Sequence, residues 1–388
     1  MRGAVRDCAP TDVAGNRLTL LESGPERLEA LIALIEGSRH SLRLLYYIYV
    51  DDAAGRRVRE ALAAARARGV AVALIVDGFG SDHAVGSGFF DPLREAGADV
   101  CCFVPRLGRR YLLRNHQKLA LADGEREDAR VIVGGFNIED SYFGEASEGA
   151  WRDLGLLVEG PAAARLVGYF DALMRWTHRP KATMRALRRE LGHWSEPEGT
   201  ARWLLGGPTR RLSPWARVVK RDMQGARRID LISAYFAPSP AMLRRLTHAA
   251  REGGRVRVVL PSRADHQIAV DAARFTEAGL LRKGVEVYEY QLTKLHTKLY
   301  LIDDTVHIGS ANFDMRSLFL NLELMLRVED AAFAGQVRGY IEGEIARSER
   351  ITPELHRARM TPWRRIKQAF AYLVMAVIDP SVTRRIAG

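Results

Sequence analysis

The chain has 388 residues, of which 47% are hydrophobic and 27% are charged. This length and composition suit a globular protein with two domains or one large pseudo-symmetric unit, and they exclude a mainly disordered chain. The net charge is +11, so we expect an anionic partner: nucleic acid, an anionic membrane or a phosphorylated substrate.

The cysteines and the absence of long apolar runs exclude further classes. Cys8, Cys101 and Cys102 are an odd number and form no CxxC pattern, which argues against a disulfide framework and against structural zinc. The first residues contain no apolar core of a signal peptide, and no run of 18 apolar residues occurs. We therefore expect neither a signal peptide nor a transmembrane helix, and a location in the cytosol or on a membrane surface.

Predicted strands and helices alternate through the first half. A strand at 16–21 precedes a helix at 23–38, which starts with a capping-box pair, Ser23 and Glu26. Its apolar residues recur with helical spacing at Leu28, Leu31, Ile32 and Ile35. The predicted elements that follow are a strand at 42–50, a helix at 55–69, a strand at 70–77, a short helix near 91–98 and a strand at 99–104. This alternation predicts an α/β fold with a largely parallel sheet.

The second half repeats the same plan. The segments that match a strand, helix, strand and strand of the first half are 228–236, 240–254, 255–261 and 284–290. A repeat of about 180 residues is too long for a solenoid and indicates two similar domains around a pseudo-two-fold axis. A basic connecting segment places the boundary near 180–205, which gives domains at 1–200 and 201–388.

The chain contains the pattern His-x-Lys-x-x-x-x-Asp twice. Only seven of its 58 basic residues are Lys, yet two of these Lys occupy matched places. The two copies are His116, Lys118 and Asp123, and His296, Lys298 and Asp303. On a strand, residues i and i+2 face the same side, so His and Lys should enter one pocket together. One copy would be a weak signal; two on apolar strands are a strong one.

Each copy is followed by a glycine-rich pattern and then by a carboxylate. These residues are Gly134, Gly135, Asn137 and Asp153 in the first half, and Gly309, Ser310, Asn312 and Glu323 in the second. Glycine lets a backbone approach a ligand closely, and Asn and Ser supply neutral hydrogen-bonding groups. Asp123 lies 11 positions before Gly134, whereas Asp303 lies six before Gly309. The charged insert "GEREDAR" explains the difference and predicts a longer surface hairpin.

Two His, two Lys and two Asn in one cleft suit a phosphodiester. One His can attack phosphorus, while the other protonates the leaving alkoxide and later deprotonates the incoming alcohol. Lys and Asn can hold the phosphoryl oxygens, and a carboxylate can fix each His tautomer. The lysines supply the positive charge, so we expect no metal and no other cofactor.

These motifs make the chain resemble the phospholipase D superfamily, whose signature is the duplicated motif. Within it the chain is similar to bacterial cardiolipin synthases from about residue 15 to about 350, in stretches such as "NHQKLALADG", "GGFNIEDSY" and "GSANFDMRSLFLNLE". The resemblance implies two tandem phospholipase D-like domains with one shared active site. Each domain would be a mixed, mostly parallel sheet flanked by helices.

The resemblance also implies a role for each residue. His116 is expected to be the nucleophile and His296 the acid and base. Phosphate is bound by Lys118, Lys298, Asn137 and Asn312, supported by Gly135 and Ser310. Asp153 and Glu323 orient the two His, and which pairs with which stays open. Asp123 and Asp303 complete the catalytic motif, and we expect them to stabilise the fold rather than contact substrate.

Two segments are candidates for contact with lipid. The chain is similar to the shorter cardiolipin synthases, which lack N-terminal spanning helices. A predicted amphipathic helix at about 361–379 is capped by Thr361 and carries an apolar stripe. Its stripe consists of Trp363, Ile366, Phe370, Leu373, Val374 and Val377. The alternative is a helix docked on the protein's own core. A second candidate, "RLGRRYLLRNH", leads directly into His116.

Four functions are compatible with these features. The first is a phosphatidyltransferase that moves a phosphatidyl group from phosphatidylglycerol to a lipid alcohol. A hydrolase of the same superfamily, a nuclease, and an inactive binding module are the alternatives. Anionic phospholipid and a membrane surface are the expected partners, on the cytoplasmic side of the bacterial inner membrane, and nucleic acid is not expected. The acceptor alcohol, the acyl preference and the oligomeric state stay open.

Overall fold

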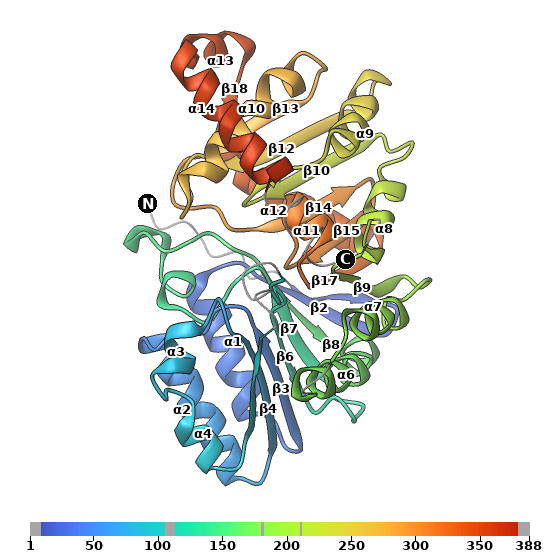
Figure 1. Ribbon diagram of the computed structural model, residues 1–388. Coiled ribbons are helices and arrows are strands. Elements are labelled where there is room, and N and C mark those ends of the chain that lie inside the picture. Colours follow the sequence, from blue (N-terminus) through green and yellow to red (C-terminus); the bar gives the residue numbers. More distant parts are fainter. Residues whose placement is uncertain (1–8, 105–112, 180–181, 210–211, 379–388) are drawn as a thin grey trace.

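Two eight-stranded sheets form the framework of the protein (Figure 1). The computed structural model describes residues 9–104, 113–179, 182–209 and 212–378. The first sheet has the order β1-β2-β8-β7-β6-β3-β4-β5 and the second β18-β13-β12-β10-β14-β15-β17-β9. A short pair, β11 (Phe236–Ala237) and β16 (Phe313–Asp314), accompanies the second sheet.

Each sheet is built from strands of one half of the chain. The first sheet contains β1 (Thr11–Val13), β2 (Asn16–Leu21), β3 (Ser41–Tyr46), β4 (Ala71–Asp77), β5 (Asp99–Phe103), β6 (Leu119–Ala122), β7 (Arg130–Gly134) and β8 (Gly155–Glu159). The second contains β9 (Ala201–Gly206), β10 (Arg228–Ser233), β12 (Arg255–Pro261), β13 (Glu286–Tyr290), β14 (Lys298–Ile302), β15 (Thr305–Gly309), β17 (Glu323–Glu329) and β18 (Ser348–Ile351). If the second order is reversed, seven strands of the two sheets correspond in position. The order β2-β8-β7-β6-β3-β4-β5 of the first sheet matches β9-β17-β15-β14-β10-β12-β13 of the second. This match confirms the predicted internal repeat.

The α/β class is confirmed, but the expectation of mostly parallel sheets is wrong. Within the two large sheets, parallel pairing is confined to β3, β4 and β5 and to β10, β12 and β13. Their remaining neighbours are antiparallel. Parallel pairing needs a long crossover between strands, whereas β6–β7 and β14–β15 are joined by hairpin loops. The charged insert forms the longer first hairpin, as the spacing predicted.

Helices cover the outer faces and lie between the halves. The first half has α1 (Gly24–Glu36), α2 (Ala53–Ala67), α3 (Asp82–Gly86), α4 (Asp91–Glu95), α5 (Pro161–Ala164), α6 (Leu166–His178) and α7 (Met184–His193). The second has α8 (Pro214–Asp222), α9 (Pro240–Arg251), α10 (Gln267–Leu281), α11 (Met315–Phe319), α12 (Ala331–Ala346), α13 (Pro353–Arg359) and α14 (Pro362–Leu373). At α1 the predicted capping box is present, because Ser23 and Glu26 bond each other's backbone N–H.

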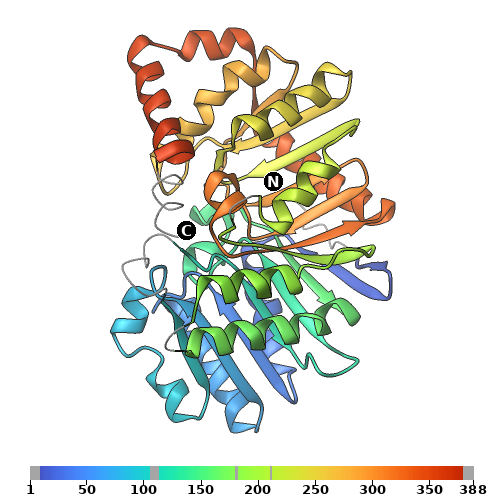
Figure 2. The same cartoon turned by 45° about the vertical axis from the view of Figure 1, so that its right-hand side comes forward.

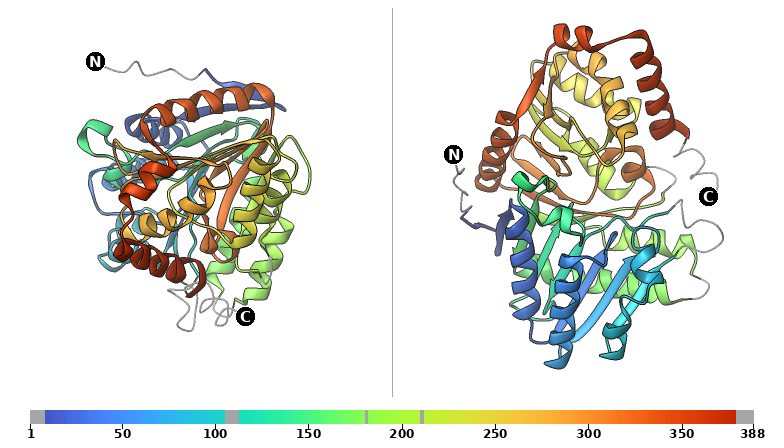
Figure 3. Two further views of the ribbon diagram at one scale, coloured as in Figure 1. Left: turned by 90° about the horizontal axis from the view of Figure 1, so that it is seen from above. Right: turned by 90° about the vertical axis from the view of Figure 1, so that its left-hand side faces the viewer.

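One continuous apolar core joins the two halves. It combines residues of both sheets with α6 and α12, including Leu121, Val133, Phe170, Leu301 and Val337. Each outer face has a core of its own, under α1 and α2 in the first half and under α8, α9 and α10 in the second. The halves are therefore stacked through buried apolar surface rather than linked loosely (Figures 1 and 3).

The two motif carboxylates lie at the far ends of their strands. Asp123 and Asp303 follow β6 and β14 with φ of 51° and 52°. The Asp123 side chain accepts hydrogen bonds from the backbone N–H groups of Arg39, His40 and Ser41, at 2.7 to 3.0 Å. Asp303 accepts from Arg227 and Arg228 in the same way. Both carboxylates fasten the start of the neighbouring strand.

We predict that Asp123→Ala lowers the free energy of unfolding. The substitution leaves three backbone donors without their acceptor, which costs about 1–3 kcal/mol, and it places Ala at a φ where Asp and Asn are better tolerated. Urea unfolding followed by circular dichroism measures the change. Asp123→Asn should recover part of the loss, and Asp128→Ala, in the exposed hairpin nearby, should change nothing. Equal midpoints for Asp123→Ala and the wild type would contradict this role.

Candidate active site

Both His-x-Lys motifs lie at the junction of the halves. The strands begin at Leu119 and Lys298, so the prediction that each His lies within a strand is wrong. The reason is that the His backbone pairs with the other half instead. His116 N–H donates to Leu322 O (2.9 Å), and His296 N–H donates to Arg152 O (2.7 Å). Each motif is thus held against the residue that directly precedes the other half's carboxylate.

Each imidazole pairs with the carboxylate of the opposite half. His116 Nδ1 lies 3.1 Å from Glu323 Oε2, and His296 Nδ1 lies 2.7 Å from Asp153 Oδ2. An ionised carboxylate can only accept a hydrogen bond, so Nδ1 carries the proton and Nε2 keeps its lone pair. The structure therefore resolves the pairing that the sequence left open, and it gives both His the same tautomer.

The carboxylates are themselves held in place. Ser310 Oγ donates to Glu323 Oε2 (2.5 Å) and Ser317 Oγ donates to Glu323 Oε1 (2.8 Å). In the first half, Leu154 N–H donates to Asp153 Oδ1 (2.8 Å). A Cβ on Gly135 would lie 2.6 Å from Asp153 Oδ1, so this position has room only for glycine. Ser310 and Gly135 thus support the carboxylates, and Ser317 is a partner that the sequence analysis missed.

The lysines and asparagines complete the same cluster. Lys118 Nζ donates to His116 O (2.6 Å). Lys298 Nζ lies against the His296 ring, 2.7 Å from Nδ1 and 3.0 Å from Nε2. The Oδ1 atoms of Asn137 and Asn312 accept from the backbone N–H groups that follow β3 and β10, those of Ile48 and Tyr235. Each Asn therefore keeps its amide N–H₂ as a donor, and in Asn137 this group bonds the Tyr142 hydroxyl (2.9 Å).

Three aromatic side chains distinguish the surroundings of the two His. The Tyr47 ring lies 5.1 Å from that of His116. Tyr142 and Trp151 lie 5.1 and 5.4 Å from His296, and the Tyr142 hydroxyl is 3.4 Å from His296 Nε2. None of the three was selected from the sequence. Trp151 could have been, because it stands two residues before Asp153, but single aromatic residues carry no distinct sequence signal.

A buried arginine braces this half of the site from behind. Arg27 on α1 donates to the carbonyls of Asp153 (2.6 Å), Tyr142 (2.7 Å) and Glu22 (3.0 Å). It therefore fixes the backbone of two residues that contact His296. Arg27 lies far from both motifs in the sequence, in a helix that reads as an ordinary amphipathic one, so only the fold reveals its position.

Burial and charge set the protonation of the cluster. Burial first, and then the neighbouring lysines, lower the pKa of His116 and of His296 to about 4. Burial also lowers the pKa of Lys298 to about 8 and that of Lys118 well below its ordinary value. At neutral pH both imidazoles are therefore neutral and able to act as nucleophile or base.

The two carboxylates are ionised in spite of their burial. Burial alone would raise the pKa of Asp153, but Lys298 and His296 lower it below the ordinary value. For Glu323, His116 and Lys118 have the same effect against burial. The cluster thus holds ammonium groups and carboxylates in balance around two neutral rings, which suits an anionic ligand with mobile protons.

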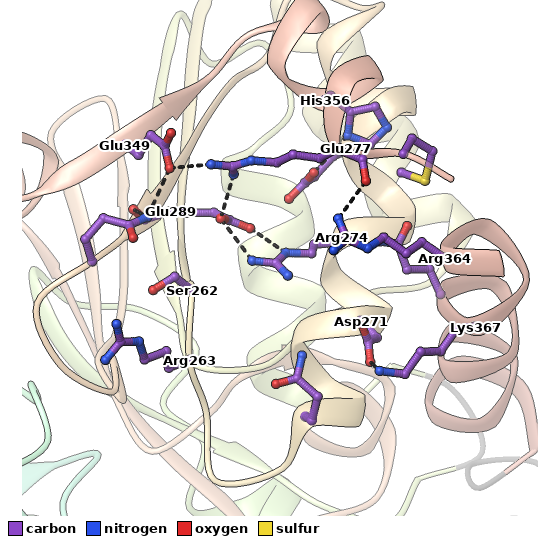
Figure 4. A pocket seen from close by; sticks show the side chains of 15 residues that line it. Ser262, Arg263, Asp271, Arg274, Glu277, Glu289, Glu349, His356, Arg364 and Lys367 are labelled. Atoms are coloured by element: carbon purple, nitrogen blue, oxygen red, sulfur yellow. Dashed lines mark hydrogen bonds and ion pairs between the residues drawn. The ribbon is translucent and has the colours of Figure 1, made fainter. Parts of the chain in front are cut away.

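Ten of the twelve residues selected from the sequence belong to this connected cluster, and Asp123 and Asp303 lie outside it. Among the described residues no group of three or more His, Cys, Asp and Glu could hold a metal ion. A separate cavity of about 480 Å³ lies under α13 and α14 (Figure 4), and none of its lining residues belongs to the motifs. The segment "RLGRRYLLRNH" falls largely on residues 105–112, outside the described part.

Comparisons with known proteins identify the family of the chain. Residues 31–174 and 220–345 match the family described as "Cardiolipin synthase, PLD-like domain". Cardiolipin synthase A of Pseudomonas aeruginosa is 33% identical over 92% of this chain and 73% of its own length. The same enzyme of Pseudomonas entomophila is 33% identical over 88% of this chain and 71% of its own.

A solved structure shares the fold. Phosphatidylserine synthase of Haemophilus influenzae has a TM-score of 0.71 with 14% identity, and 95% of each chain is covered. At this identity the likeness supports the two-domain architecture alone. The family match and the relatives' sequences carry the family assignment.

We predict that Lys298→Met raises the pKa of His296. The substitution removes a positive charge beside the imidazole, which shifts its titration upward by about 1–3 pH units. The His ring resonances, followed by NMR as a function of pH, report the midpoint. Lys367→Met, which removes a surface lysine of α14, serves as the control and should leave the midpoint in place. An unchanged midpoint in Lys298→Met would show that burial alone sets the pKa of His296.

Proposed function

The chain belongs to the cardiolipin synthase family of the phospholipase D superfamily and is a cardiolipin synthase-like phosphatidyltransferase, and we propose its reaction from this premise. The protein moves a phosphatidyl group from phosphatidylglycerol, or a related phospholipid, to a lipid alcohol. The transfer passes through a phosphohistidine. The observation that carries this proposal is the pair of imidazoles in one site, each with its Nδ1 proton on the carboxylate of the opposite half. Two such imidazoles supply a nucleophile and a proton carrier on one phosphodiester.

The surroundings of the two Nε2 atoms support different roles. Among the described residues, His116 Nε2 has no hydrogen-bond partner, so its lone pair is available to attack phosphorus. His296 Nε2 lies near the Tyr142 hydroxyl and the Lys298 ammonium, which are groups that exchange protons. We therefore assign His116 as the nucleophile and His296 as the acid and base.

The first step forms the covalent intermediate. His116 Nε2 attacks phosphorus, the P–O bond to the leaving glycerol breaks, and His296 gives its proton to that oxygen. His296 is neutral in the free protein, but a bound phosphodiester brings negative charge beside Lys118 and Lys298. This charge offsets their repulsion, raises the pKa of His296 and favours its protonated form. The positive charge that develops on His116 is stabilised by Glu323.

The second step reverses the first with a different alcohol. His296 takes the proton of the acceptor hydroxyl, the alcohol oxygen attacks phosphorus, and the N–P bond to His116 breaks. The protein returns to its starting state. Lys118, Lys298, Asn137 and Asn312 hold the phosphoryl oxygens through both steps, where preorganised donors are most effective. If water replaces the alcohol, the same site performs hydrolysis.

We further propose that α14 lies in the membrane interface. Its large apolar side chains point outward: Trp363 is 72% exposed, and Ile366 and Phe370 are each 62% exposed. Its inward side combines small apolar contacts, such as Ala371 in a cluster with Ala272 and Met315, with polar ones: Lys367 pairs with Asp271 (2.9 Å) and the Tyr372 hydroxyl bonds Pro238 O (2.8 Å). A helix that is docked through its inner side and exposes its large apolar side chains is suited to a bilayer surface.

A polar cavity adds to the contacts between α14 and the body. Beneath α14 lies the cavity of Figure 4, crossed by ion pairs such as Arg274–Glu289 and His356–Glu277. Both views of Figure 3 show α14, in dark red, on the outside of the molecule. The inner side of α14 is therefore docked on the protein while its outer side is exposed. This arrangement has features of both sequence-based alternatives, the interfacial helix and the docked helix. No described helix is long and apolar enough to cross a membrane, and the side chain of Val377 lies outside the described residues.

The products formed from phosphatidylglycerol vesicles test the proposed transfer. Purified protein is mixed with the vesicles and the lipids are analysed by mass spectrometry. We expect cardiolipin and glycerol, because a second phosphatidylglycerol supplies the acceptor hydroxyl. Phosphatidic acid with glycerol and no cardiolipin would establish hydrolysis instead. No turnover, together with cleavage of a DNA oligonucleotide, would establish a nuclease.

The two His→Ala variants should differ in whether they form the covalent phosphoryl adduct. A p-nitrophenyl phosphodiester has a leaving group that needs little protonation, so His296→Ala should still form the phosphoryl adduct and then stall. His116→Ala should form none. Intact-mass spectra after a quench that avoids acid measure both. The reverse pattern would show that the roles are exchanged between the halves.

Removal of the outward side chains of α14 should weaken membrane binding without affecting the chemistry. We expect Trp363→Ala and Phe370→Ala each to lower partitioning into vesicles by about tenfold, since each loses buried apolar area. Tyr372→Phe, on the inward side, is the matched control. Vesicle sedimentation measures binding, and turnover of a short-chain soluble phosphodiester should stay unchanged. Unaltered sedimentation of the double variant would refute the interfacial position of α14.

A further inference from the structure

A second concentration of positive charge lies on the surface between α8 and α9. A cavity of about 470 Å³ there is lined by six basic side chains: Lys220, Arg244, Arg245, His248, Arg251 and Lys283. An adjoining hollow of about 440 Å³ shares two of them and adds Arg217 and Arg221. Neither lining contains a carboxylate. We call these eight residues the α8–α9 basin.

The corresponding helix of the first half provides an internal comparison. α2 and α9 are both crossovers between parallel strands, and both carry adjacent arginines. On α2 these arginines are neutralised, because Arg56 pairs with Asp51 (2.6 Å) and Arg57 with Glu29 (2.7 Å). On α9, Arg244 and Arg245 form no ion pair or side-chain hydrogen bond within the described residues. The same crossover helix can therefore carry arginines that are neutralised, as α2 does, so the unpaired arginines of α9 are not a consequence of the fold.

The nearest carboxylates do not neutralise the basin. Asp222, at the end of α8, is held by Arg327 (2.8 Å) and His307 (2.9 Å) on the sheet, and lies farther, at 4.0 Å, from Arg221 of the basin. Glu252 lies 3.8 Å from His248 and is exposed. Cations that gather without counter-charges repel one another, and a bound anion removes that repulsion. The basin is thus a site for phosphate groups rather than a balanced surface network.

Two features favour phospholipid headgroups over nucleic acid. The linings of both hollows contain no Phe, Tyr or Trp on which bases could stack. α8 and α9 also cover the same face of the second sheet as α10, on which α14 lies with its apolar stripe outward. Figure 2 shows α8 and α9, in yellow-green and yellow, on the side of the second half that also carries α14 at its edge.

We propose that the α8–α9 basin binds the phosphate groups of anionic phospholipids at the bilayer surface, apart from the catalytic site. This proposal rests on the proposed function, which brings the protein to such a surface. The basin supplies long-range attraction and sensitivity to anionic lipid, whereas α14 supplies apolar insertion. Catalysis at a membrane should then depend steeply on its content of anionic lipid.

Sedimentation of the full chain with vesicles tests the basin. The vesicles are phosphatidylcholine alone or with a minor fraction of phosphatidic acid. Each basic residue near an anionic membrane contributes about fivefold to partitioning, so Arg244→Gln with Arg245→Gln should bind the anionic vesicles about 30-fold more weakly. Binding to pure phosphatidylcholine should not change. The difference should disappear at about 0.5 M salt, where exposed charges are screened.

The matched control is Arg56→Gln with Arg57→Gln, which removes the same charge from α2. A loss as large in this control would show that net charge, not the basin, sets the affinity. Unchanged vesicle binding together with lost binding to a DNA duplex would show that the basin is a nucleic-acid surface. Turnover of a soluble short-chain phosphodiester separates the two proposals: it should stay at the wild-type rate in both variants, and its absence in the wild type would contradict the proposed function instead.

Discussion

The imidazole–carboxylate pairs that cross between the halves are the constraint on which the site depends. His116 belongs to the first sheet and Glu323 to the second, while His296 and Asp153 have the opposite origins. Neither half alone can fix the tautomer of its own His. The shared apolar core and the backbone bonds at Leu322 and Arg152 therefore have a chemical purpose. They hold both imidazole–carboxylate pairs at the junction of the two halves, which is the arrangement that the proposed reaction needs.

This arrangement is costly without its substrate. Two lysines, two carboxylates and two imidazoles are buried together, and burial disfavours every charge among them. The protein balances part of this cost internally, through the carboxylates and the Ser310 and Ser317 hydroxyls. The remainder appears in the lowered pKa values of the His and Lys groups. In the proposed reaction an anionic phosphodiester supplies the missing counter-charge, which couples substrate binding to proton uptake by His296.

The surface of the second half also carries groups that lack a favourable partner within the protein. α14 carries exposed apolar side chains that no part of the described chain covers. The α8–α9 basin carries eight basic residues, of which only Arg221 and His248 have a carboxylate within 4.0 Å among the described residues. Each feature would be unfavourable on a protein that stays in water. The proposed position on a bilayer of anionic phospholipid accounts for both, because a bilayer offers apolar depth and phosphate charge at once. The first half, whose α2 arginines are paired, has no equivalent need.

The repeat, the α/β class and ten members of the buried cluster were predictable from the sequence, because the His-x-Lys and Gly-[Gly/Ser]-x-Asn patterns occur at matched places in both halves. The sequence could not determine the direction of the pairing, and it overestimated parallel strands because a hairpin and a crossover look alike when strands are short. Tyr142, Trp151, Arg27 and Ser317 escaped notice because their roles come from contacts across the fold. Only the tertiary structure decided that Glu323 serves His116 and Asp153 serves His296, since that choice is made where the two sheets meet and not along the chain.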